Sequence, residues 1–277
     1  MTPRVCITIP FYANLGYLEA ALRSLVAQTD DDWSAIVIDD ASPEPGARQL
    51  VAELGDDRVR YMCNDRNLGI AANFNLCLEL GRAAAEMVAI FHADDLLEPG
   101  FVAAIRSAHC AFPAAACVAT RVTVIDADGR PTRTLADSVK RVLWPRRLPF
   151  VLAGDRGLAR VMHGQFFYCP AVSYRVELLP PLHFDGRWRQ VMDLDLFARL
   201  LLGGGSIALV PERAYRFRRH DASESALNWR SFVRATEETE VIGEIVGAAR
   251  RQQWPRTVRA GRLRLTVRLN EWLARRR

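Results

Sequence analysis

The chain has 277 residues, of which half are hydrophobic and a quarter are charged, so its composition excludes a disordered or collagen-like protein. The charge is uneven: ten arginines and a single acid give residues 250–277 a charge of +9, and the overall charge of +5 leaves −4 for the first 249 residues. The positive charge therefore belongs to the carboxyl-terminal tail, and the mildly acidic body gives no indication of nucleic-acid binding.

Further classes of protein are excluded by what the sequence lacks. It has no run of about 18 uncharged apolar residues that could span a membrane, and its first residues lack the pattern of a signal peptide, so we expect a cytoplasmic protein. Lys140 is the only lysine, which excludes a P-loop. The six cysteines include no Cys-x-x-Cys pair, so neither a zinc site nor a redox dithiol is predicted.

Short apolar runs alternate with amphipathic segments through the first 112 residues. The apolar runs predict buried strands over residues 5–9, 33–38, 59–63 and 87–91. The intervening segments predict a helix that begins after Asn14 and runs to about residue 28, and further helices over 47–54, 70–80 and 99–112. This alternation is typical of a parallel sheet with helices on both faces, and the continuously apolar strands agree with burial on both sides.

After residue 113 the regular alternation of apolar runs and amphipathic segments ends. We expect strands over 118–125, 166–175 and 206–210, helices over 193–202 and 225–250, and an irregular stretch over 130–165. The sequence contains no internal repeat and no low-complexity linker. We therefore expect one α/β domain over residues 1–225 and a helical extension with a basic tail over 226–277.

Polar side chains follow each of the four predicted strands of the first half, where ligands bind in open α/β sheets. The segments concerned are Pro10-Phe-Tyr12, Asp39-Asp40, Asn64-Asp-Arg-Asn67 and His92-Ala-Asp-Asp95. The first lacks the glycines of a dinucleotide-binding turn, so a glycine-built NAD site is not predicted. Paired carboxylates can instead accept the N–H of a nucleobase or hold a hard cation. The alternative is that Asp94 and Asp95 only cap the following helix.

Taken in order, these segments resemble family 2 glycosyltransferases. The resemblance rests on Ile7-Thr-Ile-Pro-Phe-Tyr12, Leu22-Arg-Ser-Leu25 with Gln28, Val37-Ile-Asp-Asp-Ala-Ser42, Asn67-Leu-Gly69 and His92-Ala-Asp-Asp95. It is strong over residues 4–110 and thinner to about 225. It implies a GT-A-type fold, with a mostly parallel central sheet flanked by helices. The nucleotide-sugar half would then be about 1–112 and the acceptor half about 113–225.

The resemblance also implies roles for particular residues. Pro10 and Tyr12 would line the nucleoside pocket, and Asp39 or Asp40 would contact the base. The complete set expected at the nucleotide-sugar site is Pro10, Tyr12, Asp39, Asp40, Asn67, His92 and Asp95. Loop geometry is an alternative role for the segment that contains Asn67, since Gly69 there allows a positive φ.

The metal site implied by the resemblance departs from the family pattern at one position. The family's Asp-x-Asp motif falls on His92-Ala93-Asp94, which leaves Asp94 as the main ligand for Mg²⁺ or Mn²⁺. His220, in the segment Arg218-Arg-His220, would reach the metal or the diphosphate. The alternative for His220 is an ordinary surface histidine.

The catalytic base implied by the resemblance is Asp193. The family's Glu-Asp motif falls on Met192-Asp193, and an inverting transfer needs a carboxylate that removes the proton of the acceptor hydroxyl. Asp193 is also a candidate N-cap of its helix. Asp195 and Arg199 are four residues apart, so we expect an ion pair within the helix.

The implied activity is the transfer of a sugar from a nucleotide-diphosphate donor to a glycan or lipid-linked acceptor, in bacterial polysaccharide or envelope synthesis. The alternatives are a catalytically inactive nucleotide-sugar-binding protein and a nucleotidyltransferase of similar fold.

Residues 254–277 combine arginines with tryptophans and leucines, which predicts a cationic amphipathic helix. Such a helix would lie on the inner face of an anionic membrane, or pack on the acidic body.

Overall fold

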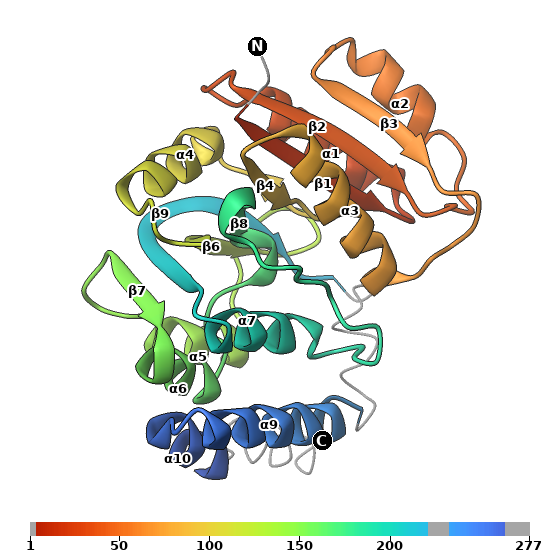
Figure 1. Cartoon of the computed structure of the whole chain (residues 1–277). Helices are drawn as coiled ribbons and strands as arrows, with labels where there is room; N and C mark the ends of the chain where they lie inside the picture. Colours follow the sequence, from red (N-terminus) through yellow and green to blue (C-terminus); the bar gives the residue numbers. More distant parts are fainter. Residues whose placement is uncertain (1–3, 221–232, 264–277) are drawn as a thin grey trace.

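The structure is a computed structural model that describes residues 4–220 and 233–263. Its described strands form one nine-stranded sheet in the order β3-β2-β1-β4-β8-β6-β9-β5, with β7 paired to β9. Helices cover both faces of this sheet and extend beyond one end of it (Figure 1). The expected α/β fold with a central sheet flanked by helices is confirmed.

The first half of the sheet is parallel. It consists of β3 (Val59–Cys63), β2 (Trp33–Asp39), β1 (Val5–Phe11) and β4 (Met87–Ile90). The helices that alternate with these strands are α1 (Leu15–Val26), α2 (Ala47–Leu54), α3 (Ile70–Ala84) and α4 (Phe101–Ala111). The predicted elements of this half are therefore confirmed within a few residues at their ends, and the Asn14 side chain caps α1 as expected.

Alternation along β1 explains why its residues are apolar on both faces. Ile7 packs on the side of α1 and α4, whereas Cys6 packs on the side of α3. Successive side chains of a strand point to opposite faces, so a strand covered on both sides needs an unbroken apolar run. That run carries the chain directly to the polar residues at the carboxyl end of the strand.

The second half of the sheet is mixed. It contains β8 (Val172–Arg175), β6 (Cys117–Ile125), β9 (Ser206–Arg218), β5 (Leu96–Leu97) and β7 (Phe150–Ala153). β8 runs antiparallel to β4 and β6, and β9 runs parallel to β6 but antiparallel to β5 and β7. The parallel order expected for the sheet thus holds for its first four strands, together with the β6–β9 pair.

Three expectations for this half are corrected. The strand expected over 166–175 is confined to β8, after a 3₁₀ turn at Cys169–Ala171. The strand expected over 206–210 continues to Arg218, past an exposed Pro211-Glu212 pair that ends the apolar run in the sequence. The stretch 130–165 is not irregular, since it holds α5 (Leu135–Leu143), β7 and α6 (Gly154–Met162).

The helices α6, α7 (Met192–Leu202), α9 (Val233–Arg251) and α10 (Pro255–Leu263) pack together at the end of the molecule away from β3 (Figure 1). Val241, Ile242 and Ile245 of α9 belong to the same buried cluster as Phe197 of α7. The helix expected over 225–250 is seen as α9, and its residues 225–232 lie outside the described residues. Within the described ranges, no helix is both long enough and apolar enough to cross a membrane.

Candidate active site

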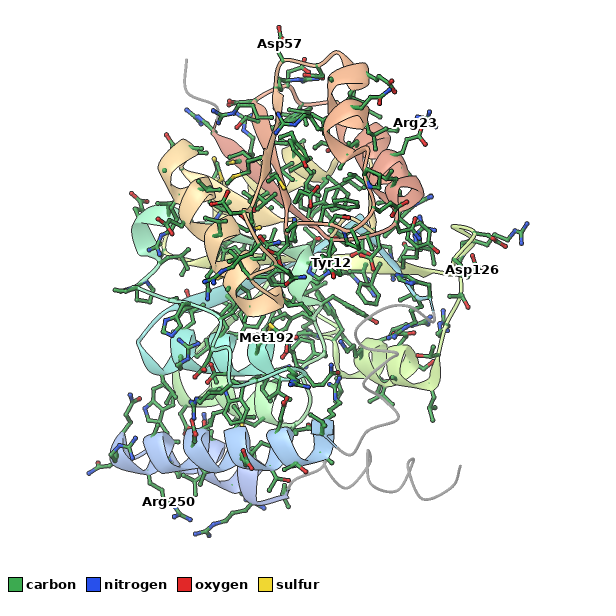
Figure 2. All side chains as sticks on the ribbon, turned by 90° about the vertical axis from the view of Figure 1, so that its right-hand side faces the viewer. Tyr12, Arg23, Asp57, Asp126, Met192 and Arg250 are labelled. Atoms are coloured by element: carbon green, nitrogen blue, oxygen red, sulfur yellow. The ribbon has the colours of Figure 1, made fainter. Side chains whose placement is uncertain are left out.

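The carboxyl ends of β1, β2 and β4 meet at one edge of the sheet. Phe11 is in register with Asp39, and the Asp40 N–H donates to the Phe11 carbonyl at 2.8 Å. Tyr12 is the residue after β1, and its side chain is half exposed, with 49% of its surface accessible. In Figure 2 Tyr12 lies near the centre of the view, with Met192, the residue before Asp193, below it.

Asp39 and Asp40 are buried and fully engaged by the protein. Asp39 accepts hydrogen bonds from the Ser42 N–H at 2.7 Å and from the Tyr61 hydroxyl at 2.7 Å. Burial, and then this bond to Asp39, raise the pKa of Tyr61. In this structure Asp39 therefore fixes the turn that follows β2. This turn lies at the edge of the sheet where the strands end.

Asp40 organises the loop that follows β3. Its two carboxylate oxygens accept from the Asn64 side chain at 2.8 Å and from the N–H groups of Leu68 at 2.8 Å and Gly69 at 3.0 Å. Asn67 lies in the same loop and also accepts from Gly69, at 2.8 Å. Gly69 has a φ of 81°, which a glycine adopts without strain, so Asn67 has the loop role given above as its alternative.

A second group of predicted residues lies at the end of β4. The candidate ligand atoms of His92, Asp94 and Asp95 lie within 4.8 Å of one another. His220, which follows β9, places its Nε2 2.9 Å from the Asp94 carboxylate. The structure thus brings together four residues that are up to 128 positions apart in the sequence.

His92 and Asp94 have the protonation states that a divalent cation requires. The Nε2 atom of His92 is buried and has no hydrogen-bond partner within the described residues. Burial lowers the pKa of His92, so its imidazole is neutral and keeps a lone pair. Burial acts to raise the pKa of Asp94, but the hydrogen bond from His220 holds it below its usual value. A carboxylate and a neutral imidazole nitrogen side by side fit a metal site.

Asp95 is placed as a support rather than as a free ligand. Its two oxygens accept from the Tyr215 hydroxyl at 2.8 Å and the Arg218 N–H at 2.6 Å, and its side chain is buried. Burial and the neighbouring Asp94 raise its pKa well above the usual range. Neither Asp94 nor Asp95 caps a helix, because α4 begins after Gly100 without a side-chain cap, so the capping alternative is wrong.

Two residues of β9 that the sequence analysis did not assign to the site hold this cluster in place. Tyr215 accepts from the His92 N–H at 3.3 Å while it donates to Asp95. Arg218 donates its Nε to the Asp94 carbonyl at 2.6 Å, and its guanidinium lies over the ring of Tyr17. The Arg218-Arg-His220 segment was the only sequence signal that pointed to this strand.

Asp193 lies in the first turn of α7. The N-cap position belongs to Val191, so Asp193 is not the N-cap that the sequence suggested, although its carboxylate accepts from the Leu194 N–H at 2.8 Å. Its other oxygen accepts from the Gln165 side chain at 2.6 Å. The charge of Asp193 contributes to the pKa of His92, which places it within electrostatic range of the cluster. The expected ion pair between Asp195 and Arg199 is confirmed, at 2.7 Å.

Lys140 is a neighbour of Asp193 that the sequence analysis used only to exclude a P-loop. Its ammonium lies 4.0 Å from the ring centroid of Tyr168. Burial lowers its pKa to about 8, and the charge of Asp193 partly offsets this effect. Nothing in the local sequence marks this lysine, because its surroundings come from distant segments.

Comparison with known proteins gives a matching family model, described as glycosyl transferase family 2, over residues 6–177. ExoO of Rhizobium meliloti, a succinoglycan biosynthesis protein, is 28% identical over 224 residues, which are 80% of this chain and 63% of ExoO. TuaG of Bacillus subtilis, a putative teichuronic acid biosynthesis glycosyltransferase, is 30% identical over 95 residues, 34% of this chain and 36% of TuaG. The chain spans less than two thirds of the length of these curated relatives.

Solved structures show the same fold. TarS 1–349 of S. aureus, in complex with UDP-GlcNAc, has a TM-score of 0.68 at 16% identity, over 88% of this chain and 66% of TarS 1–349. The mannosyltransferase PcManGT of Pyrobaculum calidifontis, in complex with GDP-Man and Mn²⁺, has a TM-score of 0.65 at 17% identity, over 99% of this chain and 72% of PcManGT. With the family model matching most of the sequence, these comparisons confirm the expected resemblance: the chain belongs to glycosyl transferase family 2 and has the GT-A fold.

Proposed function

We propose that this protein transfers a sugar from a nucleotide-diphosphate donor to an acceptor hydroxyl, with inversion and with the help of a divalent cation. The observation that carries the proposal is the cluster of His92, Asp94 and His220 at the strand-end edge, with Asp193 in electrostatic range. The two relatives named above support a role in polysaccharide or cell-envelope synthesis.

The residues that would hold the cation are Asp94, through its carboxylate, and His92, through its Nε2, which has no hydrogen-bond partner among the described residues. Carboxylate oxygens suit Mg²⁺ and Mn²⁺, and the Mn²⁺ reported with PcManGT agrees with this choice. A bound divalent cation would neutralise the charge that gathers on the leaving diphosphate. His220 holds Asp94 in position, and Asp95, fixed by Tyr215 and Arg218, holds the loop that carries both ligands.

Asp193 is the proposed base. As the acceptor oxygen bonds to the anomeric carbon, its proton passes to the Asp193 carboxylate, and the bond from that carbon to the nucleoside diphosphate breaks. Attack from the face opposite to the leaving group inverts the configuration. The hydrogen bond from Gln165 orients the carboxylate without neutralising it. Tyr12 and the walls shaped by Asp39 and Asp40 would receive the nucleoside.

The test is a transfer assay with a panel of nucleotide sugars, with Mn²⁺ and with excess chelator. We expect turnover that disappears on chelation, and an Asp94→Ala variant that folds normally but loses orders of magnitude in rate. Asp128→Asn, in an exposed turn, is the matched control and keeps its rate. Donor binding without turnover by the wild type would favour the inactive binder, and full activity in chelator would exclude the metal.

Peripheral membrane association is proposed as a secondary property. The first part of the predicted tail helix forms α10, which packs on α6 and α9 through Thr257, Ala260 and Gly261, and residues 264–277 lie outside the described residues. We expect the full chain to sediment with anionic but not neutral vesicles, and deletion of 264–277 to abolish this at unchanged fold. Equal sedimentation with and without the tail would exclude it as an anchor.

A further inference from the structure

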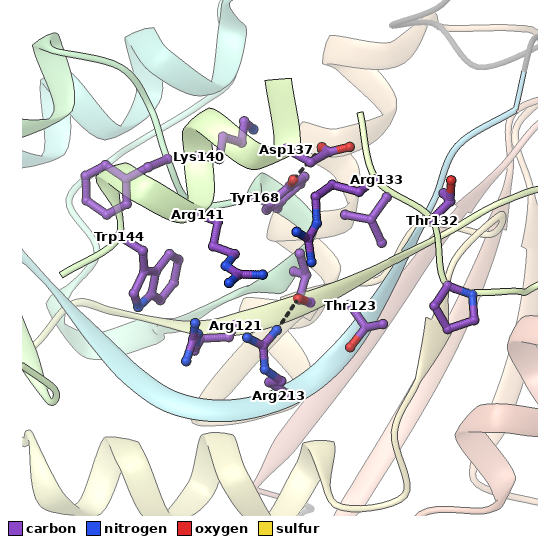
Figure 3. A pocket seen from close by; sticks show the side chains of 14 residues that line it. Arg121, Thr123, Thr132, Arg133, Asp137, Lys140, Arg141, Trp144, Tyr168 and Arg213 are labelled. Carbon is purple, nitrogen blue, oxygen red and sulfur yellow. Dashed lines mark hydrogen bonds between the residues drawn. The ribbon is translucent and has the colours of Figure 1, made fainter. Parts of the chain in front are cut away.

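A cavity of about 170 Å³ lies between α5 and the strands β6 and β9 (Figure 3). The side chains that line it include an unusual concentration of cations: Arg121, Arg133, Lys140, Arg141 and Arg213. Figure 3 shows the guanidinium groups of Arg133, Arg141 and Arg213 directed toward the middle of this cavity. The cavity is separate from the cluster around Asp94, and its lining includes none of the residues assigned above to the metal or the nucleotide sugar.

The arrangement of these arginines is electrostatically unfavourable for the free protein. Arg121 of β6 and Arg213 of β9 are partners in the strand register, so two like charges lie on neighbouring strands and repel each other. Burial, and then the charges of Arg121, Arg141 and Arg133, lower the pKa of Arg213. Within the described residues, the Arg213 side chain donates a hydrogen bond to the Val122 carbonyl, at 3.1 Å.

No acid of the described residues compensates this charge. In the described ranges, none of the four arginines forms an ion pair with a carboxylate. Asp137 is the one carboxylate in the lining, but Arg219 already binds it through two hydrogen bonds, one of them 2.9 Å long. Among the described residues, these guanidinium groups have no carboxylate partner, so their donors can bind a ligand.

The remaining wall of the cavity is aromatic. Trp144, Phe166 and Tyr168 line it. Apolar and aromatic walls with a few convergent polar groups are typical of small-molecule sites.

Two of the residues that line the cavity interact with residues at or next to the proposed reaction site. Lys140 lines it and is also within the field of Asp193, the proposed base. Asp137 lines it and binds Arg219, the residue next to His220. These two links are the reason for assigning the cavity to the acceptor rather than to the nucleotide sugar.

We propose that this cavity is an anion subsite that binds a phosphoryl group of the acceptor. The role as acceptor site rests on the proposed function. A single carboxylate would leave most of the arginines unpaired, whereas a phosphate or diphosphate brings two or more negative charges. Its oxygens match the forked donors of guanidinium groups. The phosphoryl group belongs either to a lipid-linked diphosphate or to a phosphate-bearing glycan.

Inorganic pyrophosphate is the probe, titrated calorimetrically into the metal-free full-length protein. We expect Arg121→Gln/Arg141→Gln to bind it about ten- to hundredfold more weakly than wild type, the loss expected for charge-assisted hydrogen bonds. Arg146→Gln/Arg147→Gln removes the same charge from exposed positions outside the lining and should bind normally. Asp94→Asn should also bind normally. Equal binding by the cavity variant, or loss of binding in Asp94→Asn, would overturn the proposal.

Thermal unfolding gives a second readout. Without anion, Arg121→Gln should melt no lower than wild type, because it removes a repulsion, and pyrophosphate should raise the melting temperature of wild type much more than that of the variant. Equal shifts in both would contradict the site. Farnesyl diphosphate represents a lipid-linked diphosphate, and glucose 6-phosphate represents a phosphate-bearing glycan. The compound that binds more tightly identifies the source of the phosphoryl group. Binding of neither would overturn the proposal. Because no donor is needed, absence of transfer would count against the proposed function alone.

Discussion

At Asp193 the proposed mechanism depends on basicity rather than on shape. Asn has nearly the same volume, and its amide oxygen can still accept from the Leu194 N–H. Its amide nitrogen can bond to Gln165 once the Gln165 amide turns to present its oxygen, but Asn cannot take a proton. We expect Asp193→Asn to lower kcat by about 10²–10⁴, with donor affinity unchanged. The measurement is steady-state transfer beside calorimetric donor binding. A variant that turns over like wild type would place the base elsewhere.

Lys140 offers a pH-dependent test of its surroundings. Its pKa of about 8 lies below the ordinary value of 10.5 because of burial, so the folded protein loses this proton first as the pH rises. The neutral amine is the reactive form, and we expect acylation of Lys140 to rise with a midpoint near pH 8. Between about pH 8 and 10.5 the unfolded chain binds more protons, so this residue makes stability rise with pH in that window.

The labelling experiment is simple because the sequence holds one lysine. Peptide mapping by mass spectrometry separates Lys140 from the terminal amine, and unfolded protein in denaturant is the control. A midpoint near 10.5 in the folded protein would show that the amine is solvated rather than buried beside Tyr168.

At the scale of elements, Gly81 decides how closely α3 approaches β4. A Cβ atom at this position would lie 2.5 Å from Cγ1 and 2.9 Å from Cγ2 of Val88. We expect Gly81→Ala to destabilise the fold by about 1–3 kcal/mol through overpacking. Because β4 leads directly to His92, the transfer rate should fall as well. Chemical denaturation measures the first effect.

Gly243 in α9 provides the matched control. A Cβ atom there has no neighbour within 4 Å, and the residue is exposed. Gly243→Ala should therefore stabilise the protein by about 0.5–1 kcal/mol through helix propensity alone. If both substitutions had the same sign, close packing of α3 on β4 would not be the cause.

The same scale explains which elements the sequence analysis missed. α5 has apolar residues at helical spacing, at Leu135, Val139 and Leu143, but it is short and mostly exposed and lies in an Arg-rich stretch that was interpreted as irregular. A second signal was the capping box of Thr134 and Asp137, two polar residues three apart. β9 outlasts its apolar run because β6 supplies a partner strand, and only pairing across the sheet determines where it ends.

At the scale of the whole molecule, α9 and α10 complete the core instead of forming a separate appendage. Ile242 and Val241 are buried in the same cluster as Phe197, and Glu237 accepts the N–H groups of Arg189 and Gln190 before α7. We expect a chain truncated after residue 225 to lose its cooperative thermal transition, because α6 and α7 would expose apolar surface. Circular dichroism melting checks this. A truncated chain that melts at the wild-type temperature would show that residues 1–225 fold alone.

The sequence alone was sufficient to predict the four parallel strands of this protein and the polar residues at their ends. Each buried strand is an apolar run short enough to end visibly, and each run ends in the polar residues of the strand-end edge. That pattern located Tyr12, Asp40 and Asp94, since residues at the ends of neighbouring parallel strands must meet. The match of motifs to a known family then led to the predictions that Asp193 is the base and that His220 reaches the metal or the diphosphate.

Only the tertiary structure decided the rest. In the folded protein Asp40 accepts hydrogen bonds from the loop after β3, and Asp95 accepts one from Tyr215. Nε2 of His92 has no hydrogen-bond partner among the described residues. The tertiary structure also set Arg121 opposite Arg213, 92 residues later in the chain. Charge and burial at such places depend on which distant segments pack together. Hydrophobic periodicity records that a residue is covered, but it does not record which residue covers it.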